Sequence, residues 1–305
     1  MPLTALPFAD AGLINGIVPP VIVLLCWLPY RARVRTLSHE RRAVPGWRQA
    51  CFAAGLLTLA IALSEPVDSI ADQLLVAHMA EHLVIGDISA LLIVLGFTGP
   101  LLAPLLRRRY IGKLRVFAHP LVAFPAWAIN FYAWHTPFLY QAALRHDGIH
   151  ALQHGSFLVF GIAMWMALLG PLPKPSWFGN AARLAYIIAV RLAGTILANV
   201  MIFSGTVLYP IYRATDAKWH ISPMGDQIAA AGVMMVEESL LTIGLFCWLF
   251  LKVAREAEER QQILDEAAAS GLELDERRAA RAVAAGRGDE LLERIRTRGP
   301  GATVS

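Results

Sequence analysis

Two histidines and a glutamate lie within five residues of an otherwise apolar segment, in the sequence HMAEH from His78 to His82. Residues i and i+4 of an α-helix share one face, so His78 and His82 would present their imidazoles side by side. His150 and His154 form a second pair with the same spacing. Ionisable groups in a membrane helix usually mark an ion pathway or a site, and neutral imidazole is the commonest metal ligand. The two pairs therefore predict a metal site between two helices.

A further histidine, His135, ends another apolar segment at the same expected depth as the two pairs. The candidate metal ligands are His78, His82, His135, His150 and His154. Imidazole together with thioether suits copper, and imidazole alone also suits zinc. Haem held between two facing histidines and a purely structural hydrogen-bond network are the alternatives.

Several neighbouring residues could add ligands or orient the imidazoles from behind. These are Met79, Glu81, Asp72, Tyr209, Tyr212 and Asp226. Packing is the alternative for Met79, and anchoring at the membrane surface is the alternative for the two tyrosines.

The elements that must position these residues are membrane helices. Of the 305 residues, 56% are hydrophobic and 16% are charged, with a mean hydropathy of +0.51. Apolar segments long enough to cross a bilayer occur at about 13–30, 47–64, 72–96, 118–136, 149–169, 184–208 and 227–251. The expected fold class is all-α: a polytopic membrane protein with a bundle of about seven transmembrane helices, embedded in the lipid bilayer.

The basic residues of the loops predict the orientation of this bundle. Thirteen Arg and Lys residues fall in the loops after the first, third and fifth segments, and only Arg145, Arg213 and Lys218 fall in the opposite loops. Because basic loops stay in the cytoplasm, we expect the N-terminus outside, the C-terminus inside and the histidines near the outer surface. The first residues lack a basic segment with a cleavage site, so no cleavable signal peptide is expected.

A second set of ionisable residues is expected deeper in the membrane. Asp87, Arg191, Glu237 and Glu238 fall at overlapping depths in three segments, which predicts a buried ion pair between Arg191 and a carboxylate. A proton or ion relay is the alternative.

The composition changes at about residue 252. We expect two regions, a transmembrane domain over 1–252 and a charged cytoplasmic tail over 253–305 that is partly helical or disordered. The chain contains no nucleophile–base motif, phosphate-binding loop or nucleotide fingerprint, so we expect no enzymatic activity. We also expect no nucleic-acid partner, because the basic loops are explained by topology.

Five motifs in order resemble those of a known family. They are His78-Met79-x-x-His82, Trp134-His135-x-Pro137-x-x-Tyr140, His150-x-x-x-His154, Leu208-Tyr209-Pro210-x-Tyr212 and Ser222-Pro223-x-x-Asp226-Gln227. Together with an arginine-rich loop before His119-Pro120, they are similar to the CtaG-type cytochrome c oxidase assembly factors, which are multi-span bacterial membrane proteins. The resemblance covers about 70–250 and leaves out the tail. Glu81 stands where the family usually has Gln, and Leu83 where it usually has Met, which weakens a thioether-assisted copper(I) site.

The resemblance implies a role in the maturation of haem–copper oxidase, with copper handled at the outer face of the bacterial cytoplasmic membrane. The implied ligands are the five histidines above, and the implied partners are cytochrome c oxidase subunits or other copper chaperones. A haem-binding electron carrier and a copper or proton permease are the alternative functions. The family pattern is compatible with delivery, storage or scaffolding.

Overall fold

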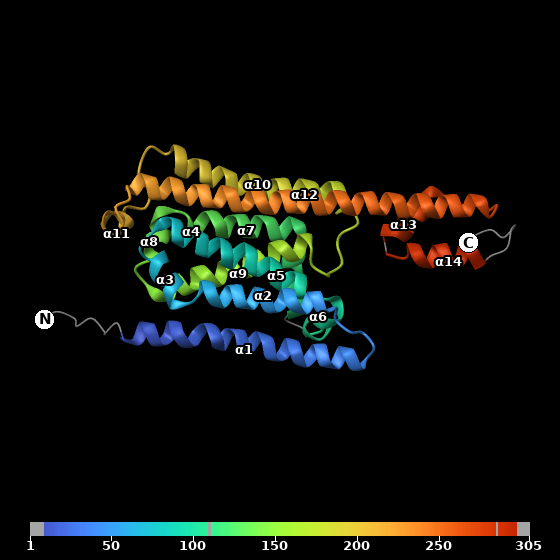
Figure 1. Ribbon diagram of the computed structural model, residues 1–305, viewed down its shortest axis with the longest axis horizontal. Coiled ribbons are helices and arrows are strands. Elements are labelled where there is room, and N and C mark those ends of the chain that lie inside the picture. The colour runs from blue at the N-terminus through green and yellow to red at the C-terminus, as the bar shows by residue number, and fades with distance from the viewer. Residues whose placement is uncertain (1–8, 109–110, 285, 298–305) are drawn as a thin grey trace. The chain divides into compact units, whose positions relative to one another are not determined.

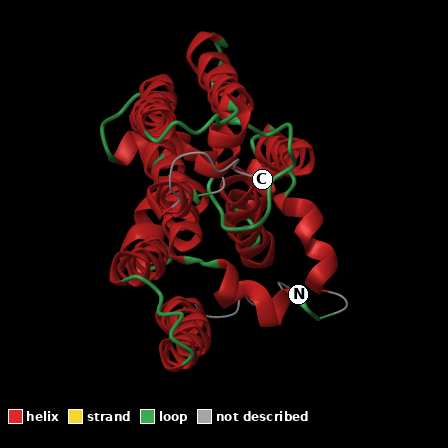
Figure 2. Ribbon diagram, turned by 90° about the vertical axis from the view of Figure 1, so that its right-hand side faces the viewer, coloured by secondary structure: helices red, strands yellow, loops and turns green. Residues whose placement is uncertain are grey.

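The computed structural model describes residues 9–108, 111–284 and 286–297, and within them every regular element is helical (Figures 1 and 2). The expected all-α class is therefore confirmed. The chain is divided into two compact units, which are Met1–Leu240 and Leu241–Ser305.

The first unit contains the elements up to the start of the last long helix. They are α1 (Ala9–His39), α2 (Gly46–Ala62), α3 (Glu65–Ala71), α4 (Leu75–Leu83), the π-helical η1 (Val84–Ser89), α5 (Ala90–Gly96), α6 (Gly99–Leu106), η2 (Ile111–Ala118), α7 (Pro120–Trp134), α8 (Pro137–Ala143), α9 (Asp147–Leu168), α10 (Asn180–Phe203), η3 (Pro210–Tyr212), α11 (Arg213–Lys218) and the part of α12 (Pro223–Ala269) that ends at Leu240. Short helices α3, α8 and α11 lie at the same end of this bundle, where α4 begins (Figure 1).

Four helical segments are long and apolar enough to cross a membrane: Leu75–Gly96, Asp147–Leu168, Asn180–Phe203 and Pro223–Ala269. The pair α2 and α3, bent by 55°, would make a fifth if it forms one span. The predicted segments 13–30 and 118–136 are also helical, in α1 and α7. Helix α7 has only 15 residues, which is shorter than the about 20 that a span needs. The chain is thus a helical membrane protein with four or five candidate spans, and the number seven and the orientation of the termini stay predictions.

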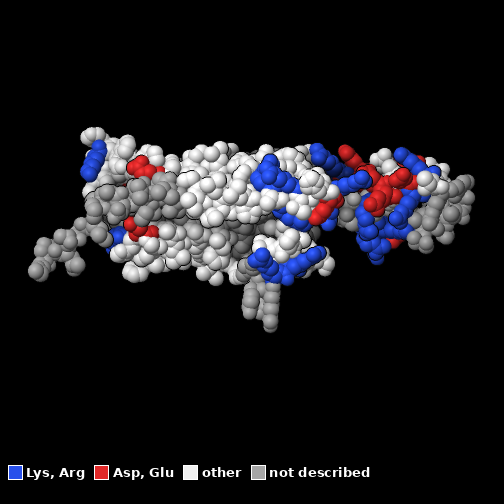
Figure 3. All heavy atoms as spheres, turned by 90° about the horizontal axis from the view of Figure 1, so that it is seen from below, with Lys and Arg blue, Asp and Glu red and all other residues white. Residues whose placement is uncertain are grey.

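The outer surface of the bundle suits a bilayer. Leu192, Ile196, Val200 and Phe203 form an exposed apolar stripe on α10. One face of the molecule shows a broad band without Lys, Arg, Asp or Glu (Figure 3). In lipid such side chains meet an apolar environment, and the helix satisfies its own backbone groups.

A close crossing brings α9 against the segment that carries the first histidine pair. A Cβ built on Gly161 would lie 2.0 Å from the carbonyl oxygen of Gly86, so no larger residue fits there. Gly86 lies within η1, which interrupts an otherwise continuous helix from α4 to α5. This close approach sets α4 and α9 side by side and so positions the histidines that both helices carry.

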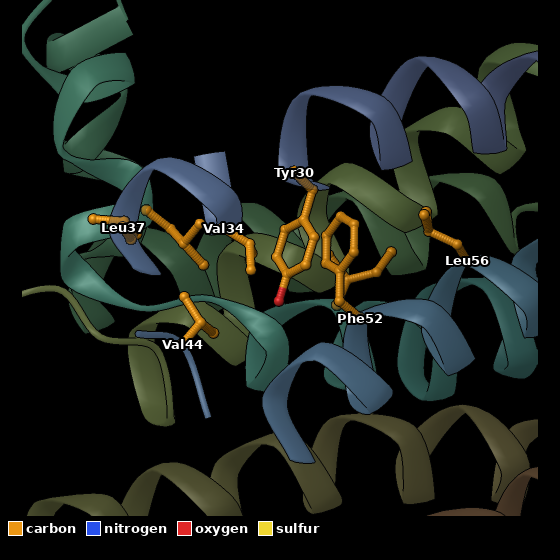
Figure 4. Packing of buried hydrophobic residues seen from close by; sticks show 8 residues of the cluster. Tyr30, Val34, Leu37, Val44, Phe52 and Leu56 are labelled. Carbon is orange, nitrogen blue, oxygen red and sulfur yellow. The ribbon is translucent and has the colours of Figure 1, made fainter. Parts of the chain in front are cut away.

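An aromatic core packs α1 against α2 (Figure 4). The rings of Tyr30 and Phe52 are stacked with their centroids 3.8 Å apart, and the Tyr30 hydroxyl donates to the Gly96 carbonyl at 3.2 Å. Arg48 donates to the carbonyls of Leu95 and Phe97 at 2.9 and 2.8 Å, which satisfies the C-terminus of α5.

The ion pair expected deep in the bundle forms between α10 and α12. Arg191 Nη1 lies 2.6 Å from Glu238 Oε2, and Arg191 Nη2 donates to the Ser239 hydroxyl at 2.9 Å. A Cβ on Gly194 would overlap the Glu238 carboxylate, so glycine at this position leaves the space that the Glu238 side chain occupies. Glu237 does not join the pair, and neither of its buried oxygens has a hydrogen-bond partner within the described residues.

We expect Arg191→Ala to lower the free energy of unfolding by about 2–4 kcal/mol, because Glu238 would be left as an uncompensated charge among apolar helices. The measurement is thermal and denaturant unfolding in detergent. The double variant Arg191→Ala/Glu238→Gln is the control and should recover most of the loss. A double variant no more stable than the single one would contradict this account of the pair.

The second unit builds its own small core. It contains the later part of α12 with α13 (Glu276–Ala284) and α14 (Gly288–Thr297). The buried apolar residues are Ile263, Ala267, Leu272, Ala279, Val283, Leu291 and Ile295. Arg296 pairs with Glu266 at 3.3 Å. The described tail is therefore largely helical, and the predicted boundary at 252 falls within α12, so that division of the chain remains a prediction.

Candidate metal site

Four imidazoles from two helices converge at the end of the bundle where α4 begins. His78 and His82 of α4 and His150 and His154 of α9 each offer a ring nitrogen, and these nitrogens all lie within 4.8 Å of one another. The ring centroids are 4.3 Å apart within the α4 pair and 4.2 Å apart within the α9 pair. Across the helices, His78 lies 5.2 Å from His150 and His82 lies 5.3 Å from His154. We call this set the four-imidazole site.

The site is buried, yet its nitrogens lack partners. Exposed fractions are 0% for His78, 5% for His82 and 7% for His154, and His150 is half-buried. Among the described residues, no hydrogen-bond partner is found for Nε2 of any of the four or for Nδ1 of His82. Buried polar groups are rarely left in this state, and a structural network would have paired them. Such an arrangement could hold one cation among four nitrogens.

Two tyrosines orient His78 from behind. The Tyr212 hydroxyl lies 3.1 Å from His78 Nδ1 and 3.4 Å from the Ala71 carbonyl, which it can reach as a donor. Tyr140 completes the chain at 3.1 Å from Tyr212. In the tautomer that carries the proton on Nδ1, His78 donates to Tyr212 and leaves the lone pair of Nε2 free to bind a cation. Tyr209 supports the neighbouring loop by donating to the His135 carbonyl at 2.7 Å.

Asp226 positions the start of α4 and is not a member of the four-imidazole site. Its two oxygens accept from the backbone N–H groups of Leu75 and Val76 at 2.6 and 3.0 Å. These donors belong to the first turn of α4, where they have no partner within the helix. The carboxylate also faces the positive end of the helix dipole. Asp226 therefore ties the start of α12 to the helix that carries His78 and His82.

His135 lies beside the four imidazoles and is not brought within ligand distance of all of them. Its Nδ1 donates to the Phe131 carbonyl at 2.7 Å, one turn back in α7, and its ring centroid is 6.3 Å from that of His82. A cavity of about 20 Å³, room for one water molecule, is lined by both rings and by Asp87, Met79 and Met234. Of the other expected residues, Asp72 is exposed and Met79 is buried against this cavity.

Three residues near the site have roles that the sequence analysis did not assign. Tyr140 extends the chain behind His78, Asp216 packs against Asp226, and Asp68 lies beside Glu81 and His150. Tyr140 belongs to one of the five motifs of the family resemblance, but that motif gave it no role of its own. For Asp68 and Asp216, no local pattern indicates a site, because their partners lie on other helices.

Asp216 of α11 predicts a pH dependence. Its side chain is 1% exposed, and burial together with the neighbouring Asp226 carboxyl raises its pKa from its usual 3.8 to about 6. The folded state therefore binds a proton more tightly than the unfolded state, and stability falls as the pH rises from about 4 to about 6. The loss is at most about 3 kcal/mol.

Asp216→Asn should flatten this part of the stability profile and make the protein more stable than wild type at pH 7. Thermal unfolding from pH 4 to 8 measures the effect. Asp289→Asn, which removes the same charge in the first turn of α14, is the control and should keep the wild-type slope. An unchanged slope in Asp216→Asn would show that another group titrates.

Comparison with known proteins places this site in context. Residues 24–256 match the family model of the cytochrome c oxidase caa3 assembly factor, Caa3_CtaG. Proteins named only as uncharacterized in Mycobacterium bovis and Mycobacterium tuberculosis are each 23% identical over 246 residues. That alignment covers 74% of this chain and 37% of each relative, so the chain spans little more than a third of their length. No solved structure is detectably similar.

The matched range contains both histidine pairs, the two tyrosines behind His78 and the Asp226 cap, so the site described above lies entirely within the family region. The family model also covers well over half of the chain. The chain therefore belongs to the cytochrome c oxidase caa3 assembly factor family.

Proposed function

We propose that this protein supports cytochrome c oxidase assembly by binding copper, as its cargo, at the four-imidazole site. The observation that carries the proposal is the convergence of four nitrogens within 4.8 Å, from histidines whose Nε2 atoms are buried and unpartnered. Family membership supplies the context, because the assembly of an oxidase that contains haem and copper requires copper to be delivered.

The ligand chemistry supports copper over other cations. Imidazole suits both copper and zinc, and divalent copper binds more tightly than zinc to a given nitrogen site. Met79 packs beside His82 at the neighbouring cavity, but it is not a member of the four-nitrogen set. Imidazoles therefore carry the affinity, with zinc as the competing ion and haem as the third candidate.

The site would face the outside of a bacterial cytoplasmic membrane. The basic loops predict this orientation, and at the site end of the bundle Asp68 and Asp72 would instead offer negative charge to an arriving cation. In this role the protein is not an enzyme. Its partners would be oxidase subunits or other copper chaperones, which receive or supply the ion.

Complementation of a deletion strain tests the function. Oxidase activity and the copper content of the purified oxidase are measured after expression of wild type, His78→Ala/His82→Ala or His146→Ala. His146 is exposed, one turn before His150, so its variant is a matched control. We expect wild type and the control to restore both quantities, and the double variant to fail unless copper is added. Full restoration by the double variant would refute the proposal.

Two further measurements separate the alternatives. A haem-binding electron carrier would show a Soret band in the purified protein, which copper binding alone would not produce. A permease would move copper or protons in proteoliposomes, and neutralising Asp87, Glu237 or Glu238 would stop the movement. We expect neither a Soret band nor transport.

A further inference from the structure

A second group of possible ligands adjoins the four-imidazole site. Asp68 of α3, Glu81 of α4 and His150 of α9 each offer one ligand atom, and these atoms all lie within 4.8 Å of one another. Asp68 and His150 are half-buried, whereas Glu81 is only 2% exposed. Three separate helices thus bring two carboxylates and one imidazole to a single point.

Glu81 indicates independently that a cation belongs there. Both of its carboxylate oxygens are buried, and neither has a hydrogen-bond partner among the described residues. Its nearest basic group is His154, whose Nε2 lies 3.8 Å from Glu81 Oε1, beyond hydrogen-bond distance. Burying an unpaired carboxylate is costly, and a bound cation would offset that cost.

His150 belongs to both groups of ligands. It completes the four nitrogens with His78, His82 and His154, and it also completes the trio with Asp68 and Glu81. An ion held by the trio could therefore reach the other imidazoles while keeping a bond to His150. If the ion exchanges Asp68 and Glu81 for imidazoles while it stays bound to His150, the free-energy barrier is lower than if it is first released into the apolar bundle.

We propose that Asp68, Glu81 and His150 form an outer site that accepts a divalent transition-metal cation and passes it through His150 to the four-imidazole site. This inference rests on the proposed function. Carboxylates are hard ligands and favour a divalent cation such as Cu²⁺ or Zn²⁺ over the soft copper(I) ion. Three protein ligands leave a coordination position open, as at sites where a ligand is exchanged.

The solvent exposure of the ligands indicates which of the two sites a cation reaches first. The trio has two half-buried members, whereas three members of the four-imidazole site are buried. Asp72, exposed and one turn after Asp68, adds negative charge beside the trio. The trio is therefore the first site that a cation meets and the four-imidazole site is the second.

Zinc titration of the metal-free, full-length protein in detergent tests the order. Zn²⁺ is chosen because it has no redox chemistry. Isothermal titration calorimetry and elemental analysis after gel filtration should find two bound ions in wild type, one held by His78, His82 and His154 and the other by Asp68, Glu81 and His150. Glu81→Gln and Asp68→Asn should each retain only the ion of the four-imidazole site, and His82→Ala should retain only the outer ion. His150→Ala should weaken both sites, and Glu65→Gln, an exposed carboxylate of α3, should keep two ions.

The outcomes separate the two proposals. One ion in wild type, lost in His82→Ala and kept in Glu81→Gln and Asp68→Asn, would refute the outer site and leave the four-imidazole site intact. No bound ion in wild type would overturn both. Thermal unfolding accompanies each variant, and if Glu81→Gln does not fold, the half-buried Asp68→Asn decides the question.

Discussion

Replacing His82 with alanine is expected to weaken copper binding by roughly 100-fold or more, because loss of a ligand costs at least as much as loss of a group that orients one. His82 is 5% exposed, and neither ring nitrogen has a hydrogen-bond partner among the described residues. Its imidazole is one of four that converge within 4.8 Å. Alanine leaves three nitrogens of the four-imidazole site.

Competition against a chromophoric copper chelator measures this change in affinity. His146→Ala removes an exposed imidazole close to the same site and should leave the affinity within about twofold of wild type. If His82→Ala bound copper as tightly as this control, His82 would not be a ligand. The site would then need a different set of donors.

Replacing Asp226 with alanine is expected to lower the free energy of unfolding by about 2–5 kcal/mol, because one buried and one part-buried backbone donor lose their acceptor. Those donors are the N–H groups of Leu75 and Val76, at 2.6 and 3.0 Å from the carboxylate. The substitution also removes a negative charge from the positive end of α4. Since α4 carries His78 and His82, we expect copper affinity to fall as well.

Asp275 provides a matched control for this cap. Its carboxylate accepts from the N–H group of Arg277 at 3.1 Å, at the exposed start of α13. Asp275→Ala should cost at most about 1 kcal/mol, since water can replace the lost acceptor. Chemical and thermal unfolding in detergent compare the two variants. A cost for Asp226→Ala as small as that of the control would show that α4 does not depend on this contact.

The sequence predicts the helices and the pairing of histidines on each helix, because both follow from local spacing. The length of the apolar segments places helices at all the expected positions, and the i, i+4 spacing aligns His78 with His82 and His150 with His154. Which helices become neighbours is not a local property. Here it depends on the close crossing at Gly161 and Gly86, whose significance appears only once both backbones are placed.

Two expected site residues show why side-chain roles escape the sequence. His135 was expected at the same depth in the membrane as the other histidines. Its Nδ1 donates to the Phe131 carbonyl, and its ring lies beside the four-imidazole site. Asp226 was expected to approach the metal or orient its ligands, and it caps α4 instead. Both outcomes depend on which backbone group lies nearest in three dimensions.

Glu81 combines a departure from the family pattern with an unusual environment. It stands where the resemblance leads one to expect Gln, and its carboxylate is buried without a hydrogen-bond partner among the described residues. Unlike a neutral amide, a carboxyl group can lose its proton and bind a cation as a carboxylate, which would offset the cost of its burial. The outer site is accordingly proposed for this chain and not for the family.

X-ray absorption spectroscopy of the protein loaded with one equivalent of copper tests the central claim most directly. The account predicts a first shell of nitrogen atoms at about 2.0 Å with the outer-shell scattering of imidazole. This signal should disappear in both His78→Ala/His82→Ala and His150→Ala/His154→Ala, and persist in His146→Ala. A shell dominated by sulfur, or the same imidazole shell in either double variant, would contradict a site built from these four histidines.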